Sequence, residues 1–556
     1  MSDIIRRRAF LGTTRNTDVH ECLVEYEFPR GDLNSSDPYA NTFGQSNITK
    51  INWPEGVEHI FKYAFINSRI TSDSINSMPD TVKQIDTYAF SYLPNLSGNI
   101  TLPSSLEYLG DSAFTYCTAS SVTFQSSEYL ILGPSVFSSC SQLGTITLPE
   151  NLVLAMAANN PFFGTLWYTN KTTGDVYLGK NYITYKNNMP SNTNLTLESG
   201  TLSIAASAFS NKTRLKSIVI PDTVQFIGNG AFSGCTGLTS ITIPKSLSRI
   251  IYAGVGRTQV NKIEVNTTSG AGGIISLASP FYSTACTGIT TVNWNAVRGY
   301  GGSGTVAYND FLGGGTYLPN VTEINFGSEV IEIPNYICSG LKKITSVTIP
   351  SSAKYIGSYA FYQCTGLTSI TFPENIEKFN SIGTILGGCT GITTLNYNAI
   401  SARKYANEDA TSPSTNTNSL WGATSNLTTV NIGNQVQVIP SGFLGSGQSK
   451  VTSITIPSSV TTIDYGAFYS SKLTSIDLPS SVALIRSYAF AGCTSLTSIT
   501  IRATTPPTLD PGYTYSSTFP STSQNYTIYV PSSSVNTYKT TSKWSNWASK
   551  IQAIPS

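Results

Sequence analysis

The sequence LKSIVIPDTVQFIGNGAFSGC, residues 215–235, recurs with the same spacing as LTSIDLPSSVALIRSYAFAGC, residues 473–493. Both follow the pattern L-x-x-I-x-I-P-x-x-V-x-x-I-x-x-x-A-F-x-x-C, with Leu478 in place of the second isoleucine. The proline of this pattern returns at a step of 23 residues, from Pro221 to Pro244 and from Pro350 to Pro373. A period of this length indicates a solenoid, in which each copy is one coil that is stable only when stacked on its neighbours.

The order of residue types within one copy predicts the path of a coil. Leu238, Ile241 and Ile243 alternate with polar residues, as in a strand that buries one face. The proline that follows ends this strand, because it has no N–H for a strand ladder. A second short extended segment comes next, and the Ala-Phe pair then places one ring in the interior. The fold class is therefore mainly β: a solenoid of coils of about 23 residues with parallel strand ladders.

Cysteine positions follow the same period. Six of the nine cysteines lie at or near the end of a copy, and no Cys-x-x-Cys pair occurs. We expect a row of small buried thiols rather than disulfides or a zinc site. The six are Cys117, Cys140, Cys235, Cys364, Cys389 and Cys493.

Composition excludes several classes of function. Charged residues make up only 12% of the chain and the formal net charge is +2, so no strong field attracts nucleic acid or an anionic membrane surface. No stretch approaches the roughly 18 apolar residues that a membrane-spanning helix needs. Arg7-Arg8-Ala9-Phe10-Leu11 resembles a twin-arginine export motif, but polar residues stand where an apolar region should follow. We expect no nucleic-acid partner, no membrane insertion and no signal peptide.

The repeat unit resembles the BspA-like leucine-rich repeat, which occurs in surface proteins of gut anaerobes, in some protozoa and in phages. The resemblance covers most of residues 46–502. Residues 167–209 are similar to a hairpin-bearing segment often embedded in such proteins, and residues 503–556 are similar to their usual C-terminal end. The resemblance implies adhesion or ligand binding, and it brings no catalytic motif and no cofactor.

The domain organisation expected from these patterns has three parts. Residues 1–45 form an N-terminal cap or docking arm, with a strand predicted where Cys22, Val24, Tyr26 and Phe28 alternate with other residues. Residues 46–502 form the solenoid, which contains a hairpin insert at about 164–200. Residues 503–556 form a C-terminal cap, with a strand from Tyr526 to Val530 and with Trp544, Trp547 and Ile551 at helical spacing on one face.

A duplicated segment marks the candidate binding site. CTGITTVNWNA, which begins at Cys286, recurs as CTGITTLNYNA from Cys389, and an irregular excursion follows each copy, at about 299–317 and 401–421. Insertions in solenoids often project from the binding face, although tolerated surface loops without a ligand are an equal alternative. Aromatic residues in or beside the excursions are the candidates for contacting a sugar ring or a protein. They are Trp294, Tyr300, Tyr317, Tyr397, Tyr405 and Trp421.

No catalytic, cofactor-binding or metal-ligating residue is predicted. The only two histidines, His20 and His59, lie in different units and form no triad or metal motif. Gly299-Tyr-Gly-Gly-Ser-Gly304 matches a dinucleotide-binding pattern in form, but Thr305-Val-Ala-Tyr follows it instead of a helix. A glycosidase with two carboxylates stays formally open, because no pattern selects a pair.

We therefore expect a non-catalytic recognition or adhesion protein on a phage particle or outside the cell. It would bind a host surface glycan or protein and attach to other virion proteins through one terminal segment. One alternative is a structural scaffold whose repeats bind sister subunits, and another is a bacterial surface adhesin of the BspA type.

Overall fold

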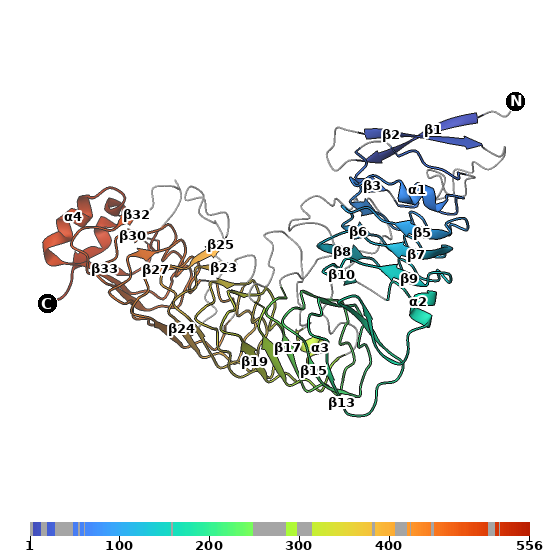
Figure 1. Cartoon of the computed structure of the whole chain (residues 1–556). Helices are drawn as coiled ribbons and strands as arrows, with labels where there is room; N and C mark the ends of the chain where they lie inside the picture. The colour runs from blue at the N-terminus through green and yellow to red at the C-terminus, as the bar shows by residue number, and fades with distance from the viewer. Residues whose placement is uncertain are drawn as a thin grey trace. The chain divides into compact units, whose positions relative to one another are not determined.

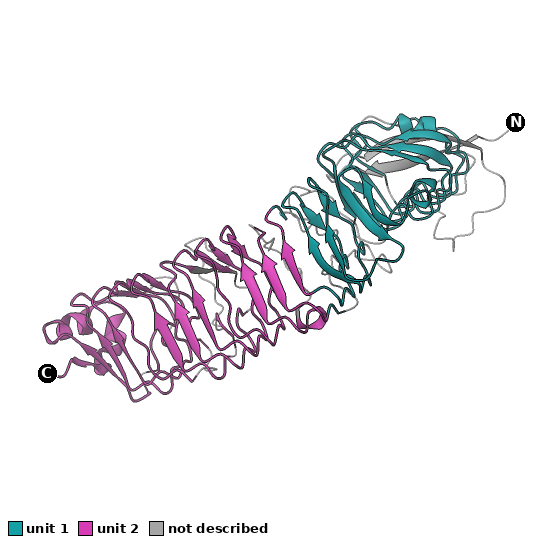
Figure 2. Ribbon diagram, turned by 60° about the horizontal axis from the view of Figure 1, so that its bottom comes forward, with its two compact units in different colours: residues 1–238, 246–286 teal, residues 239–245, 287–556 magenta. Residues whose placement is uncertain are grey.

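The computed structural model describes the backbone of residues 4–12 and 19–27. From residue 48 it describes 48–53, 56–60, 62–156, 160–247, 285–296, 314–380, 384–405, 420–422, 424–445, 450–509, 518–521 and 523–556, with the backbone alone at Asn380 and Arg403–Tyr405. The chain divides into two compact units, shown in teal and magenta in Figure 2. Unit 1 comprises residues 1–238 and 246–286, and unit 2 comprises residues 239–245 and 287–556. Each unit is a stack of coils that carries strands on two sides.

Unit 1 begins with an antiparallel pair and continues with parallel ladders (Figure 1). The pair is β1 (Ile4–Gly12) and β2 (Val19–Glu27), which confirms the strand predicted around Cys22. One ladder joins two- to four-residue strands in the order β10-β8-β6-β4-β3, and the other has the order β5-β7-β9. Their bounds are β3 (His59–Ile60), β4 (Gln84–Ile85), β6 (Tyr108–Leu109), β8 (Tyr129–Leu132), β10 (Val153–Met156), β5 (Gly98–Thr101), β7 (Ala119–Thr123) and β9 (Thr145–Thr147).

The rest of unit 1 contains the insert and two more small sheets. They are formed by β11 (Gly174–Leu178), β12 (Asn181–Lys186), β14 (Ser203–Ile204) and β16 (Phe226–Ile227), and by β13 (Thr193–Thr196) and β15 (Leu215–Val219). Two short helices, α1 (Ser72–Asn76) and α2 (Leu166–Thr169), complete the elements of this unit among the described residues.

Unit 2 repeats the two-sided arrangement with parallel pairing throughout its described strands. One side carries β17 (Ser240–Ile243), β18 (Thr291–Trp294), β19 (Glu323–Phe326), β22 (Ser369–Phe372), β24 (Thr394–Tyr397), β26 (Thr429–Ile432), β29 (Ser475–Leu478), β31 (Ser498–Ile501), β33 (Thr527–Val530) and β34 (Ile551–Ala553). The other carries β20 (Glu332–Ile333), β21 (Tyr355–Ile356), β23 (Lys378–Asn380), β25 (Arg403–Tyr405), β27 (Val438–Ile439), β28 (Thr462–Ile463), β30 (Leu484–Ile485) and β32 (Thr508–Leu509). The helical segments are α3 (Gly314–Tyr317), η1 (Ser532–Ser534), α4 (Val535–Thr540) and η2 (Trp544–Lys550).

The turn proline closes a coil in the way that the sequence predicts, wherever the repeat carries it. The carbonyl of Pro221 accepts the N–H of Val224 at 3.1 Å, and that of Pro457 accepts the N–H of Val460 at 3.1 Å. The proline therefore ends one strand and begins the tight turn that leads to the next. This arrangement needs no N–H at the proline, so the residue costs no ladder bond.

Phenylalanine rings form a column inside unit 1. Phe114 lies between Phe90 and Phe137, with ring centroids 5.3 and 5.4 Å away and nearly parallel planes. Phe209 and Phe232 stack in the same way at 5.4 Å. All five rings are at most 1% exposed. Because each ring contacts the rings of the coils before and after it, the column joins successive coils as much as it fills any one of them.

The cysteine row is buried and structural, as predicted. All eight cysteines whose side chains the structure describes are free thiols in the interior. The Cys140 thiol donates a hydrogen bond to the carbonyl of Phe114 at 3.0 Å, and the Cys235 thiol donates one to Phe209 at 3.1 Å. Each thiol thus satisfies a backbone carbonyl of the preceding coil. Burial raises the pKa of Cys235 to about 12, so this sulfur stays protonated at neutral pH.

Close approach of the coils explains one recurrent glycine. A Cβ atom on Gly228 would lie 2.3 Å from the backbone nitrogen of Ala206 and 2.6 Å from the carbonyl oxygen of Met156. Backbone occupies that space on both sides, so a side chain here would force neighbouring coils apart.

The hairpin predicted at about 164–200 is present as β11 and β12, which pair antiparallel. Its second strand also pairs parallel with β14, so the insert extends the ladder of the coils instead of leaving it. The Asn181 side chain accepts the N–H of Leu154 at 2.8 Å and donates to the carbonyl of Leu152 at 2.9 Å. Lys186 fixes the insert by donating to the carbonyls of Tyr168, Thr169 and Lys171 at 2.6 to 3.0 Å.

The ladders continue beyond residue 502, where the sequence suggested that a cap begins. β32 pairs with β30, and β33 and β34 add to the ladder of β31. The strand expected from Tyr526 to Val530 is confirmed by β33. Trp544 and Trp547 are buried in η2, but Ile551 begins β34, so the three residues do not share one helix.

Candidate recognition surface

Three of the six aromatic residues proposed for ligand contact are core residues. Trp294 and Tyr397 are 0% exposed and Trp421 is 1% exposed. The prediction that they form part of an outer binding surface is therefore wrong. Strand register gives the reason: Trp294 pairs with Ile243 and Tyr397 pairs with Phe372, so both occupy the position of the second, inward isoleucine of the repeat.

Trp421 organises an aromatic cluster inside unit 2. Its ring lies 5.0 Å from Phe372, 5.5 Å from Phe379 and 5.8 Å from Phe443, measured between centroids. Among the described residues, the Tyr397 hydroxyl and the Trp421 Nε1 have no hydrogen-bond partner, so ring packing holds the cluster. The carbonyl of Trp421 also accepts the N–H of Leu386 at 3.0 Å. Trp421 therefore anchors the end of the second excursion to the stack.

The other three aromatic candidates are not brought together. Tyr317 is half-buried and ends α3. Tyr405 ends β25, and its side chain lies outside the described residues. Tyr300 and most of both excursions also lie outside them. A binding role for these three stays a prediction.

The outward face of the unit 2 strands carries an uncharged polar row. We name it the asparagine–threonine row, and its side chains are exposed or half-buried. Strand pairing and isolated bridges place its members on successive coils. They are Thr242, Asn293, Asn325, Thr348, Thr371, Asn396 and Asn431.

Hydrogen bonds between side chains hold this row in place. The Asn325 amide donates to Asn293 Oδ1 at 3.1 Å, and Asn293 donates to Thr242 Oγ1 at 3.2 Å. Farther along, Asn431 donates to Asn396 Oδ1 at 2.8 Å, and Asn396 donates to Thr371 Oγ1 at 3.0 Å. An amide offers two N–H donors and two lone pairs. Because each of these bonds uses one donor or one lone pair, capacity for hydrogen bonds to a partner remains.

Sequence reasoning missed this row, although a signal was present. Asn293 and Asn396 follow the inward Val292 and Leu395 by one residue, so strand alternation alone would have placed their amides outside. Residue type alone points instead to their aromatic neighbours Trp294 and Tyr397.

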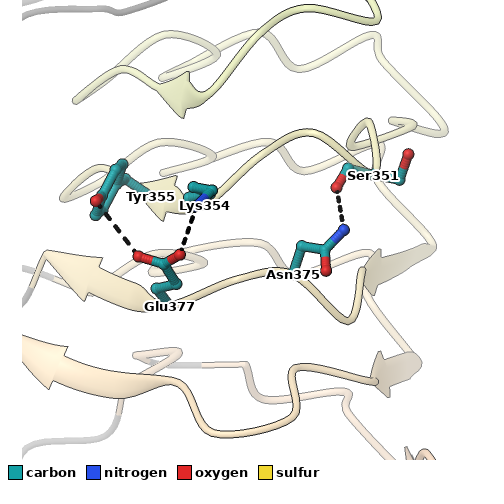
Figure 3. A network of polar contacts seen from close by, with 5 residues as sticks. All are labelled: Ser351, Lys354, Tyr355, Asn375 and Glu377. Atoms are coloured by element: carbon teal, nitrogen blue, oxygen red, sulfur yellow. Dashed lines mark hydrogen bonds and ion pairs between the residues drawn. The ribbon is translucent and has the colours of Figure 1, made fainter.

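A second polar cluster lies on the other side of unit 2 (Figure 3). Lys354 Nζ lies 2.8 Å from Glu377 Oε1, and the Tyr355 hydroxyl donates to Glu377 Oε2 at 3.4 Å. The hydrogen bond from Lys354 is the main cause that lowers the pKa of Glu377. Both charged side chains are 48% exposed, so water screens the pair and it contributes little to stability.

No group of three or more potential metal-ligating side chains occurs among the described residues, and no helix in that part of the chain is long and apolar enough to cross a membrane.

Stacked coils, parallel strand ladders on two sides and a recurrent proline turn define a leucine-rich-repeat solenoid protein. The model of the BspA-type leucine-rich repeat region matches residues 38–78, 73–173, 181–272, 316–408 and 416–541, with six copies. The chain belongs to this family, which confirms the resemblance seen in its repeat unit.

Several solved structures are similar to this chain. A leucine-rich repeat protein from Bacteroides ovatus is 17% identical, with 86% of this chain and 93% of that chain covered and a TM-score of 0.35. A leucine-rich cell surface protein from Faecalibacterium prausnitzii is 16% identical, covering 72% and 87%, with a TM-score of 0.24. The pneumococcal vaccine antigen PcpA is 15% identical, covering 82% and 87%, with a TM-score of 0.28. No curated protein matches the sequence.

Proposed function

We propose that this chain is a non-catalytic recognition protein that binds a glycan or protein on a cell surface through the asparagine–threonine row. The observation that carries the proposal is the row itself: uncharged amides and hydroxyls stand on successive coils. Side-chain hydrogen bonds of 2.8 to 3.2 Å hold it in two runs, Thr242–Asn293–Asn325 and Thr371–Asn396–Asn431. Side chains that are already ordered lose little entropy when a partner binds. Membership of an adhesin-type repeat family is consistent with this role.

Adsorption of the purified protein to cells tests the proposal. The binding variant replaces Asn293, Asn325, Asn396 and Asn431 with alanine. The control variant replaces Asn375 and Asn426, whose amides donate to the carbonyls of Ser351 and Thr390 and lie outside the row. We expect saturable adsorption that weakens at least about tenfold in the binding variant, because each lost hydrogen bond costs ~0.5–1.5 kcal/mol. Equal adsorption of the binding variant and the wild type would refute the role of the row.

Two treatments of the cells separate the kinds of partner. Periodate oxidation destroys sugar diols, and protease removes surface proteins. Loss of adsorption after periodate alone identifies a glycan, and loss after protease alone identifies a protein. If the wild-type protein adsorbs to no cell tested but forms stable oligomers in solution, the structural scaffold is the better account.

We propose further that the chain is carried on a phage particle and attached there to other virion proteins through a terminal segment. Support comes only from the occurrence of similar repeats in phages. Mass spectrometry of purified particles tests this proposal, which is abandoned if the chain is found only on bacterial surfaces.

A further inference from the structure

Most coils adopt the left-handed backbone conformation at two positions. One immediately precedes the Ala-Phe pair, and the other follows the phenylalanine by two residues. The second position is occupied in unit 1 by Asn67, Tyr92, Tyr116, Ser139, Gly164, Asn211 and Gly234, with φ between 56° and 78°. In unit 2, Gly340, Gln363, Gly388, Ser470 and Gly492 take the same place, with φ between 54° and 75°.

Tyrosine is an unexpected residue at this second position. A side chain with a Cβ atom is disfavoured in the left-handed region, whereas glycine adopts it freely. Glycine, asparagine and serine occupy most copies accordingly, and among the described residues Tyr92 and Tyr116 are the aromatic exceptions. Five tyrosines adopt the same conformation at the first position, but their side chains are half-buried, whereas those of Tyr92 and Tyr116 are exposed. The five are Tyr63, Tyr88, Tyr336, Tyr359 and Tyr488. Exposure therefore sets Tyr92 and Tyr116 apart and suggests a function for their side chains.

The two tyrosines lie on adjacent coils and stack on each other. Their ring centroids are 4.8 Å apart and the planes differ by 15°. Tyr92 is 42% exposed and Tyr116 is 53% exposed, which makes them two of the five exposed large apolar or aromatic side chains in the described part of the chain. Stacking fixes both rings while a large part of each stays open to solvent, so a ligand would meet an ordered surface.

Uncharged polar side chains flank this pair on the neighbouring coils. The N–H of Asn67 donates to the carbonyl of Ser91, next to Tyr92, and the N–H of Tyr116 donates to that of Ser138, next to Ser139. We name Asn67, Tyr92, Tyr116 and Ser139 the tyrosine row. It offers one amide, two phenol rings and one hydroxyl, and no charged side chain.

We propose that the tyrosine row is a binding site for neutral oligosaccharides. The apolar C–H face of a pyranose ring packs against an aromatic ring, and its hydroxyls bond to phenol, amide and hydroxyl groups. The absence of charge in the row matches an uncharged glycan better than an anionic one. This inference rests on the proposed recognition function, but it concerns a different surface in the other unit.

Titration of the full-length protein with neutral hexasaccharides of glucose, mannose and N-acetylglucosamine tests the site. Fragments of alginate and hyaluronan serve as anionic probes. The double variant Tyr92→Gly with Tyr116→Gly removes both rings and leaves a residue that suits the backbone, so its melting temperature should stay unchanged or rise. Tyr92→Phe with Tyr116→Phe keeps the rings and removes the hydroxyls. Ser470→Gly is the control, because it makes the same backbone change at the equivalent position of a coil in unit 2, outside the tyrosine row.

We expect at least one neutral hexasaccharide to bind, and its affinity to fall about tenfold or more in the glycine double variant. The phenylalanine double variant should lose less affinity than the glycine double variant, because it keeps the rings and loses only the phenol hydroxyls. Ser470→Gly should bind like the wild type. The proposal is overturned if no neutral hexasaccharide binds, if only anionic fragments bind, or if the glycine double variant binds like the wild type. The variant of the asparagine–threonine row should keep this binding, so a failure here is distinct from a failure of cell adsorption through unit 2.

Discussion

Replacing Phe114 with alanine is the sharpest test of how the coils are joined. The side chain is fully buried and stacks on Phe90 at 5.3 Å and on Phe137 at 5.4 Å. Loss of a buried phenylalanine costs about 3–5 kcal/mol through transfer and cavity terms. Two stacked contacts, each worth about 0.5–1.5 kcal/mol, place this site at the upper end, near 5 kcal/mol. Urea unfolding followed by circular dichroism measures the change in the free energy of unfolding.

Phe163→Ala is the matched control, because it is the same chemical change in the same unit. Phe163 is 63% exposed, and its replacement should change the free energy of unfolding by less than about 1 kcal/mol. Equal destabilisation by the two variants would mean that the phenylalanine column does not hold the coils together.

Three further predictions concern single buried or half-buried sites. Cys235→Ala should cost about 1–3 kcal/mol in urea unfolding, because it leaves the Phe209 carbonyl without its donor, whereas Cys235→Ser, which keeps a donor, should cost less. Gly228→Ala should lower the free energy of unfolding by about 3 kcal/mol, since its Cβ would meet backbone at 2.3 Å, and a melting temperature equal to that of the wild type would contradict the packing described. Burial raises the pKa of Asp111 above its ordinary value of 3.8, so the unfolded chain loses this proton at a lower pH than the folded one. Stability should therefore fall as the pH rises through the raised pKa, and Asp111→Asn should remove that part of the pH dependence of the urea midpoint.

The repeat could be predicted from the sequence because each of its positions obeys a local rule. Phe232 and Phe490, which the pattern places in the interior, are 0% exposed. The proline turns and the buried thiols follow the same period, so a single alignment of the chain with itself locates them. Strand alternation, turn residues and the repeat period all indicate the same coil, so the fold can be predicted from the sequence.

The candidate site could not be predicted as well, because exposure depends on register and not on residue type. Trp294 and Tyr397 are of residue types that are common in binding sites, but their side chains lie on the inward side of their strands. Tyr92 and Tyr116 occupy turn positions whose left-handed conformation no local rule assigns to tyrosine. The two rings are brought together by stacking between coils, and such a contact joins residues 24 apart in the sequence.

Hydroxyl-radical footprinting of the native protein, read residue by residue by mass spectrometry, tests most directly which rings face the interior and which face a partner. Tyr92, Tyr116 and Phe163 should be oxidised readily, while Trp294, Tyr397 and Trp421 should be protected until the protein unfolds. Oxidation of Trp421 in the native protein at the rate of Tyr116 would contradict the central claim, that Trp421 is packed inside the coils and Tyr116 is exposed on their surface.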